Sequence, residues 1–80
     1  MQYSEFGKFL RRKRESLHPE VSLNNFALEN GIEPAALSRI ERQKQGIILE
    51  RLEQIANGYG VFISELLSEY EQTLTIKKRS

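Results

Sequence analysis

The chain has no cysteine and no tryptophan, and only one histidine and two prolines among its 80 residues. Without cysteine it forms no disulfide bond and no thiolate metal site, and His18 alone does not make a zinc site. No apolar run approaches the roughly 20 residues of a membrane-spanning helix, and the opening MQYSEFGKFL lacks the apolar core of a signal peptide. The sequence therefore predicts a cytoplasmic protein with no metal, no cofactor and no membrane contact.

The groupings of side chains that carry most enzyme chemistry are also missing. There is no cysteine nucleophile, no pair of carboxylates in a recognisable site and no glycine-rich phosphate loop. We therefore expect a binding protein rather than an enzyme. Eighty residues make one domain, near the lower size at which a single apolar core is sufficient.

Charge is nearly balanced overall, with a formal net charge of +1, but it is unevenly distributed. Residues 1–17 carry five cations against two carboxylates, whereas residues 48–72 carry one cation against five carboxylates. Residues 73–80 add three cations and no carboxylate. This distribution allows a basic face on a nearly neutral molecule. The alternative is a set of ordinary solvated helix faces, and charge by itself does not decide between the two.

Apolar residues recur at helical spacing along most of the chain, which predicts an all-α fold. The five expected helices span residues 4–17, 22–30, 34–43, 48–58 and 62–72. Ser4 and Ser22 suit the N-caps of the first two helices, and Pro34 suits the first turn of the third. We expect one domain over residues 1–72. The sequence TLTIKKRS in the basic tail, residues 73–80, fits a frayed end, a short strand or a partner-contacting arm.

The stretch VSLNNFALENGIEPAALSRIERQK joins two short expected helices by a three-residue turn with glycine, which is the helix-turn-helix pattern. It resembles the Cro/CI-type (XRE) helix-turn-helix family of phage and bacterial repressors. The matching positions are Phe26-Ala27, Gly31-Ile32 and the run from Leu37 to Arg42. The resemblance continues through LERLEQIANGYGVFISELL. It implies a compact five-helix, lambda-repressor-like domain with a central helix-turn-helix that binds double-stranded DNA.

Two residues of this motif are expected to hold the fold together. Glu41 lies on the inner side of the third helix, where a carboxylate is costly unless it is paired. The resemblance implies a salt bridge from the first helix, and Arg14 is the matching arginine. We therefore expect a partly buried Arg14–Glu41 pair. Ala27 is expected where the second helix crosses the third, since a larger side chain would push the helices apart.

The resemblance also implies that the third helix enters the major groove with its N-terminus first. Ala35 and Ala36 are small enough to allow close approach to base edges, and Ala35 can pack on a thymine methyl. Arg39 is the expected reader of guanine, although a solvated arginine paired with Glu41 or Gln43 is the alternative. The expected base-reading residues are Glu33, Pro34, Ala35, Ser38 and Arg39. The expected phosphate contacts are Ser22, Asn24, Asn25, Arg42 and Lys44.

Several positions depart from the family pattern. Leu23 replaces a glutamine that clamps a phosphate, and Glu33 stands where a serine or threonine usually caps the third helix. Glu33 repels phosphates but can accept a hydrogen bond from a cytosine amino group. Gln43 replaces a glycine, which costs up to about 1 kcal/mol if the residue must be left-handed. Ile47 and Ile48 indicate either a deeper core or an exposed apolar patch.

Two functions fit these features. The first is a sequence-specific transcriptional regulator, a repressor or autoregulator, that binds a palindromic operator as a homodimer. Its expected dimer contacts are Phe62, Tyr70, Leu74 and Ile76, for which packing within one domain is the alternative. The second function is a protein-binding module or antitoxin-like protein, with a toxin or another protein as its partner. A steep loss of binding with added salt would favour DNA over an apolar protein interface.

Overall fold

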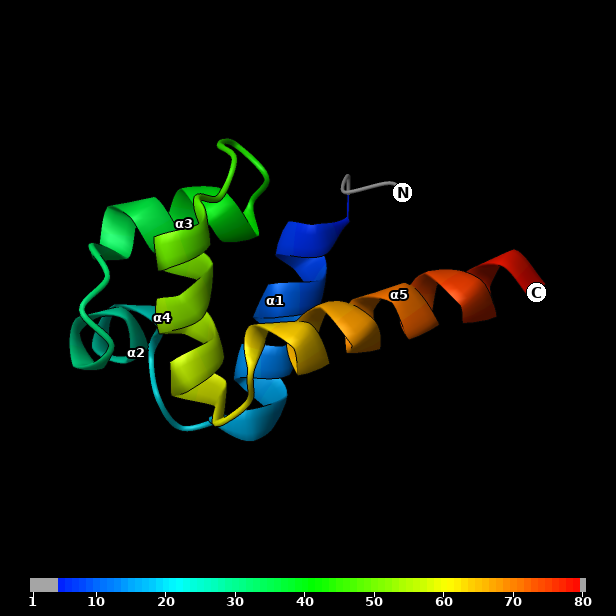
Figure 1. The fold of residues 1–80 in the computed structure, drawn as a ribbon. Coiled ribbons are helices and arrows are strands. Elements are labelled where there is room, and N and C mark those ends of the chain that lie inside the picture. Colours follow the sequence, from blue (N-terminus) through cyan, green and yellow to red (C-terminus); the bar gives the residue numbers. More distant parts are fainter. Residues whose placement is uncertain (1–4, 80) are drawn as a thin grey trace.

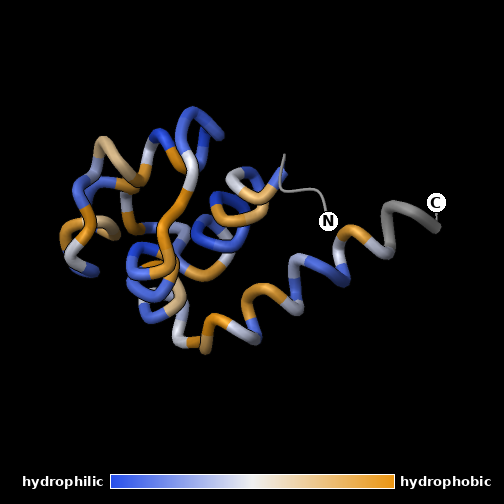
Figure 2. Tube along the Cα trace, turned by 45° about the horizontal axis from the view of Figure 1, so that its top comes forward, coloured by the Kyte–Doolittle hydropathy of each residue, from blue (hydrophilic) through white to orange (hydrophobic). Residues whose placement is uncertain are grey.

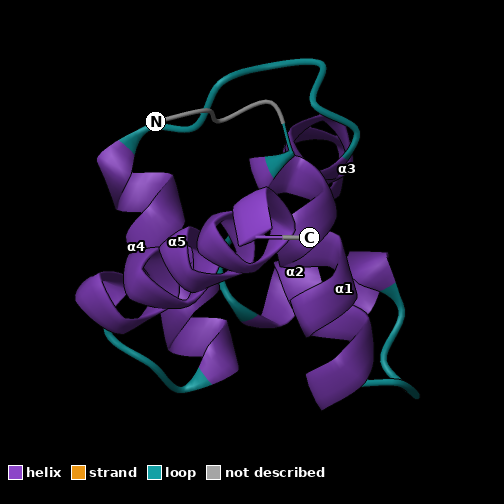
Figure 3. Ribbon diagram, turned by 90° about the vertical axis from the view of Figure 1, so that its right-hand side faces the viewer, coloured by secondary structure: helices purple, strands orange, loops and turns teal. Residues whose placement is uncertain are grey.

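The computed structural model describes the backbone of residues 5–79 and the side chains of residues 5–75. The helices are α1 (Phe6–Leu17), α2 (Leu23–Glu29), α3 (Pro34–Glu41), α4 (Leu49–Tyr59) and α5 (Ile63–Arg79). Figure 1 shows α1 to α4 gathered into one body, from which α5 extends toward the C-terminus. Figure 3 shows α5 end-on, between α4 and α1. The described residues form helices and no strand, so the expected all-α fold is confirmed.

The starts of the first two helices follow from their capping residues. Ser22 caps α2, as expected, because its hydroxyl oxygen accepts a hydrogen bond from the backbone N–H of Asn25 at 3.1 Å. In α1 the N-cap position belongs to Glu5, without a side-chain capping bond. Ser4, the expected cap of this helix, lies outside the described residues. The expected boundary of α1 was therefore about two residues too early.

The largest difference from the expected helices lies at the C-terminus. The expected fifth helix stops at residue 72, whereas α5 continues to Arg79. Thr73 and Thr75 each donate a hydroxyl hydrogen bond to the carbonyl four residues earlier, at 3.1 and 3.0 Å. These bonds satisfy the hydroxyls within the helix and suit a helical rotamer of threonine. A frayed end or a strand is therefore wrong for residues 73–79.

The apolar core forms where the helices meet. Leu10 of α1, Leu37 of α3, Ile55 of α4 and Leu66 of α5 are completely buried. Ala27 of α2 is also completely buried, in agreement with the small residue expected beside α3. Burying each large aliphatic side chain contributes about 1.5–3 kcal/mol, so these residues fix how the five helices pack. The core thereby sets the direction of α3.

Gln43 follows α3 with a left-handed φ of 62°, and it is the one non-glycine residue with positive φ among the described residues. We therefore expect Gln43→Gly to raise the free energy of unfolding by up to about 1 kcal/mol, because glycine adopts this conformation without strain. Urea unfolding measures the change. Lys44→Gly is the matched control, and it should lower stability because its φ is not positive. Two variants that shift the midpoint in the same direction would contradict this account.

Tyr59 joins α4 to α1 inside the core. Its hydroxyl donates a hydrogen bond to the backbone carbonyl of Leu10 at 2.7 Å, and its side chain is buried. Burial disfavours the charged phenolate and raises the pKa of Tyr59 above the ordinary value, and the nearby Glu41 carboxylate adds to this effect. The folded protein therefore keeps this proton at a pH at which the unfolded chain loses it.

The raised pKa of Tyr59 makes stability depend on pH in the alkaline range. The contribution of the protonated Tyr59 to the free energy of unfolding is complete below the ordinary tyrosine pKa of about 10. It is lost as the pH rises above that value, by up to about 1.4 kcal/mol per pH unit. Tyr59→Phe removes this titrating group, so its stability should decline less steeply above pH 10 than that of the wild type. Urea unfolding between pH 8 and 11 compares the two declines. Parallel declines would rule out Tyr59 as the source.

Candidate nucleic-acid interface

The turn between α2 and α3 is closed by glycine and held from two sides. Gly31 adopts a left-handed φ of 73°, and the backbone N–H of Ile32 donates to the carbonyl of Ala27 at 2.8 Å. On the other side, the amide of Gln54 in α4 donates to the carbonyl of Gly31 at 3.3 Å. Figure 1 shows α2 and α3 at one side of the body, joined by this turn. The helix-turn-helix therefore has a defined geometry.

One face of α3 is buried and the other is open to solvent. Leu37, Ile40 and Glu41 point inward. Ala36 is also buried, so its expected role in close approach to DNA is wrong: it packs against the domain. Of the expected base-reading residues, Glu33, Ala35 and Arg39 are exposed, and Pro34 and Ser38 are half-buried. The open face thus begins with the small Ala35 and ends with arginines.

Arg39 is held by the loop that follows α3. Its Nε donates a hydrogen bond to Oε1 of Gln45 at 2.6 Å. This partner is neither Glu41 nor Gln43, the residues considered from the sequence. Because the bond uses Nε, the two terminal nitrogens of the guanidinium remain available for a bidentate contact. The side chain is therefore positioned at the surface without being fully occupied.

The expected pair between α1 and α3 is present and is almost completely buried. Arg14 donates from Nε to Oε2 of Glu41 at 2.7 Å and from Nη2 to Oε1 at 2.9 Å. The two side chains are 7% and 2% exposed. Two parallel charge-assisted bonds fix distance and angle together, and donating them to Glu41 raises the pKa of Arg14 above its ordinary value. The pair anchors α3 to α1 and so orients its open face.

The expected phosphate contacts lie on the surface of the domain. All of them are exposed: Ser22, Asn24, Asn25, Arg42 and Lys44. Leu23 at the start of α2 lines a shallow hollow together with Ser38 of α3 and with Arg42, the residue that follows α3. Arg42 makes one long hydrogen bond, from Nε to the carbonyl of Ser38 at 3.4 Å. The start of α2 and Arg42 therefore both lie near the C-terminal half of α3.

No family model matches the chain. It is similar to the Control protein C.MunI of Mycoplasma sp, with 33% identity over 67 residues that span 84% of this chain and 89% of the relative. This chain belongs to the control-protein family. Because the similarity covers most of both chains, it extends well beyond the helix-turn-helix itself. Membership in this family makes the chain a small DNA-binding transcriptional regulator, and its narrower assignment to the Cro/CI type stays a prediction.

Three cations of α1 lie beside the end of α3, although the sequence alone did not indicate that they do. Lys8, Arg11 and Arg12 line a surface hollow together with Arg42 and Gln43 at the end of α3. The excess of positive charge in residues 1–17 was the available signal, and the spacing of these cations places them on one helical face. Their closeness to α3 is a tertiary contact, which the charge count alone does not reveal.

The expected dimer contacts fall into different environments. Tyr70 is buried, with its ring centroid 4.9 Å from that of Phe6 and 5.3 Å from that of Phe9, which favours the alternative of packing within one domain. Phe62, by contrast, is 77% exposed. Leu74 is half-buried against the core, and the side chain of Ile76 lies outside the described residues. Apolar and polar residues alternate along α5 in Figure 2.

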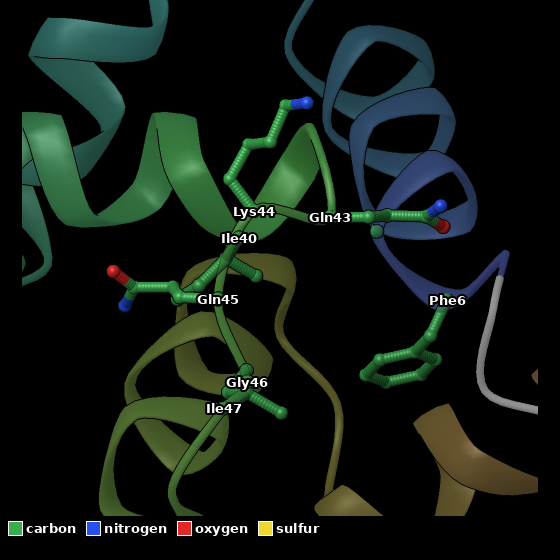
Figure 4. A pocket seen from close by; sticks show the side chains of 8 residues that line it. Phe6, Ile40, Gln43, Lys44, Gln45, Gly46 and Ile47 are labelled. Carbon is green, nitrogen blue, oxygen red and sulfur yellow. The ribbon is translucent and has the colours of Figure 1, made fainter.

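The two isoleucines after α3 also differ. Ile47 is half-buried and lines an open hollow of about 720 Å³ with Phe6 and Ile40 (Figure 4). The polar ends of the loop side chains Gln43, Lys44 and Gln45 point in different directions in the same view. Ile48 and its neighbour Leu49 are 64% and 70% exposed. Ile48 therefore fits the exposed apolar patch, and Ile47 packs against the core as a partly buried side chain.

Two further findings concern the part of the chain that the structure describes. None of its helices combines the length and the apolar character needed to cross a membrane. Within the same residues, His and Glu side chains do not gather in a group of three that could hold a metal ion.

Proposed function

We propose that this member of the control-protein family binds a palindromic operator as a homodimer, with α3 in the major groove, and represses or autoregulates transcription. The open face of α3 carries this proposal. It combines a small residue in the first turn, Ala35, with Ser38 and the arginines Arg39 and Arg42 farther along. The buried Arg14–Glu41 pair holds that face in one orientation.

Each side chain on the face has a contact that suits its chemistry. Arg39 reads a guanine through its terminal nitrogens, and Ala35 packs on a thymine methyl. Pro34 and Ser38 lie along the same base edges, and the carboxylate of Glu33 accepts from a cytosine amino group. The remaining polar residues hold backbone phosphates: Ser22, Asn24, Asn25, Arg42 and Lys44.

A homodimer would present two recognition helices to one side of the duplex, about 34–36 Å apart. The exposed ring of Phe62 supports an interface near the start of α5, since a large apolar side chain on the surface gains from being covered. We place Leu74 and Ile76 at the same interface, farther along α5. Sedimentation of the wild type and of Phe62→Ser tests this part, and equal masses for the two proteins would contradict it.

The similarity to a control protein supports a proposal for the class of target genes. Control proteins are regulators of restriction-modification genes. We propose that the operator of this chain lies upstream of genes of this kind.

The function is tested by selection from random duplex DNA with purified, folded protein at moderate salt, read by sequencing. The expected result is a palindromic motif with half-sites about one helical turn apart. Lys13→Ala is a matched control, because Lys13 pairs with Glu69 of α5 at 2.8 Å. This variant should select the same motif as the wild type. No enrichment from protein with intact circular dichroism would exclude operator binding.

A further inference from the structure

The end of α3 and one face of α1 together form a basic surface that the helix-turn-helix does not include. Lys8, Arg11 and Arg12 of α1 lie beside Arg42, around a hollow of about 450 Å³. All four side chains are exposed. The two helices approach closely here because α1 carries Gly7, where a Cβ atom would collide with the backbone oxygens of Ile40 and Glu41.

The carboxylates at this hollow are already in use. Glu41 is buried and occupied by Arg14. Glu15 lies 3.5 Å from Arg11 in an exposed pair, which contributes at most about 1 kcal/mol. Among the described residues, neither Lys8 nor Arg12 makes an ion pair. Within this described part of the chain, Lys8, Arg12 and Arg42 thus gather without a paired carboxylate, an arrangement that attracts an anion.

The position of the hollow indicates which anion it meets. A neighbouring shallow hollow is lined by Arg11 of α1, Leu23 at the start of α2 and Ser38 of α3. The cations of α1 therefore continue directly into the open face of α3. Since the major groove is about 12 Å wide, a helix inside it brings the adjoining surface against the phosphates of the groove wall.

We propose that Lys8, Arg11, Arg12 and Arg42 form a cradle for a backbone phosphate of the duplex that α3 reads. This α1 cradle rests on the proposed function and extends it to a helix outside the helix-turn-helix. Guanidinium groups suit the role because they donate paired hydrogen bonds to phosphate oxygens. A phosphodiester contact of this kind positions the protein and carries no base sequence.

The test compares Lys8→Ala, Arg12→Ala and the double variant with the wild type. Fluorescence anisotropy gives the Kd for the selected operator and for a random duplex between 50 and 200 mM salt. Each lost phosphate contact should reduce the slope of log K against log salt by about 0.9. Both DNAs should lose affinity by the same factor, so that their affinity ratio stays unchanged. Lys13→Ala removes the same charge from the α5 side of the same helix and should keep the wild-type slope.

Different outcomes separate this proposal from the one on which it rests. A wild type that binds the operator, with unchanged slopes in the α1 variants, would overturn the cradle alone. A changed ratio between operator and random duplex would also overturn it, since a backbone contact reads no sequence. Absence of DNA binding by the wild type would overturn both proposals.

Free phosphates share the chemistry of the DNA backbone, so a second arm uses pyrophosphate without DNA. Calorimetry at constant ionic strength should give no saturable heat with the wild type. Saturable binding that Lys8→Ala abolishes, together with an unchanged DNA slope, would assign the hollow to a free anion and overturn the proposal.

Discussion

Arg14→Ala is expected to lower the free energy of unfolding by about 3–5 kcal/mol, because it leaves a buried carboxylate without its partner. Glu41 is 2% exposed at its side chain, and it receives both of its charge-assisted hydrogen bonds from Arg14. Water does not replace these bonds at a buried site. The variant must therefore unfold locally or keep an uncompensated charge in the core, and either result lowers stability.

Urea unfolding of the wild type and Arg14→Ala measures this loss. Arg11→Ala is the matched control, since it removes an arginine from the same helix whose pair with Glu15 is more than half exposed at both side chains. The control should change stability by at most about 1 kcal/mol. A double replacement, Arg14→Met with Glu41→Leu, should recover much of the loss because no buried charge remains. Equal unfolding midpoints for the wild type and Arg14→Ala would refute this account of the pair.

Arg39→Ala is expected to remove about 1–3 kcal/mol of discrimination at one base pair of each half-site, which is roughly 5-fold to 150-fold in relative affinity. The reason is geometric. Gln45 holds Nε of Arg39 at 2.6 Å and leaves the terminal nitrogens for the guanine edge. Alanine keeps the helix but removes both donors, so the preferred base at that position should become degenerate.

Competition between operator variants that differ at single base pairs measures this change. Lys44→Ala is the matched comparison, because Lys44 is an exposed cation just beyond α3. It should weaken binding to all sequences alike and reduce the salt slope. If both variants lost the same affinity on every DNA, the assignment of Arg39 as a reader and Lys44 as a phosphate contact would be wrong.

Much of the fold was predictable because its signals are local. Ser22 as a cap, Gly31 in a left-handed turn and Pro34 in a first helical turn each act through the backbone within a few residues. The same holds for the left-handed Gln43, which stands where the family has glycine. The Arg14–Glu41 pair was expected from the family pattern, and its near-complete burial came from the packing of α1 on α3.

Other features needed the assembled helices. Ala35 and Ala36 are adjacent and chemically identical, but a helix turns by about 100° per residue, so one faces solvent and the other the core. Tyr70 fits an interface or a core equally well by its spacing, and the rings of Phe6 and Phe9 decide for the core. α5 continues to Arg79 through a stretch whose composition favours a strand, and the hydroxyls of Thr73 and Thr75 are satisfied within the helix.

The sequence by itself therefore determined the five helices apart from the end of α5, the turn and the side chains that α3 carries, because spacing and backbone preference act over short distances along the chain. Only the tertiary structure decided which apolar side chains lie inside and which charges meet. Lys8 and Arg42 stand far apart in the sequence, and they meet at one hollow because α1 crosses the end of α3 at Gly7. Such contacts arise when burial of the core sets the angles between helices, and no single segment of the sequence determines these angles.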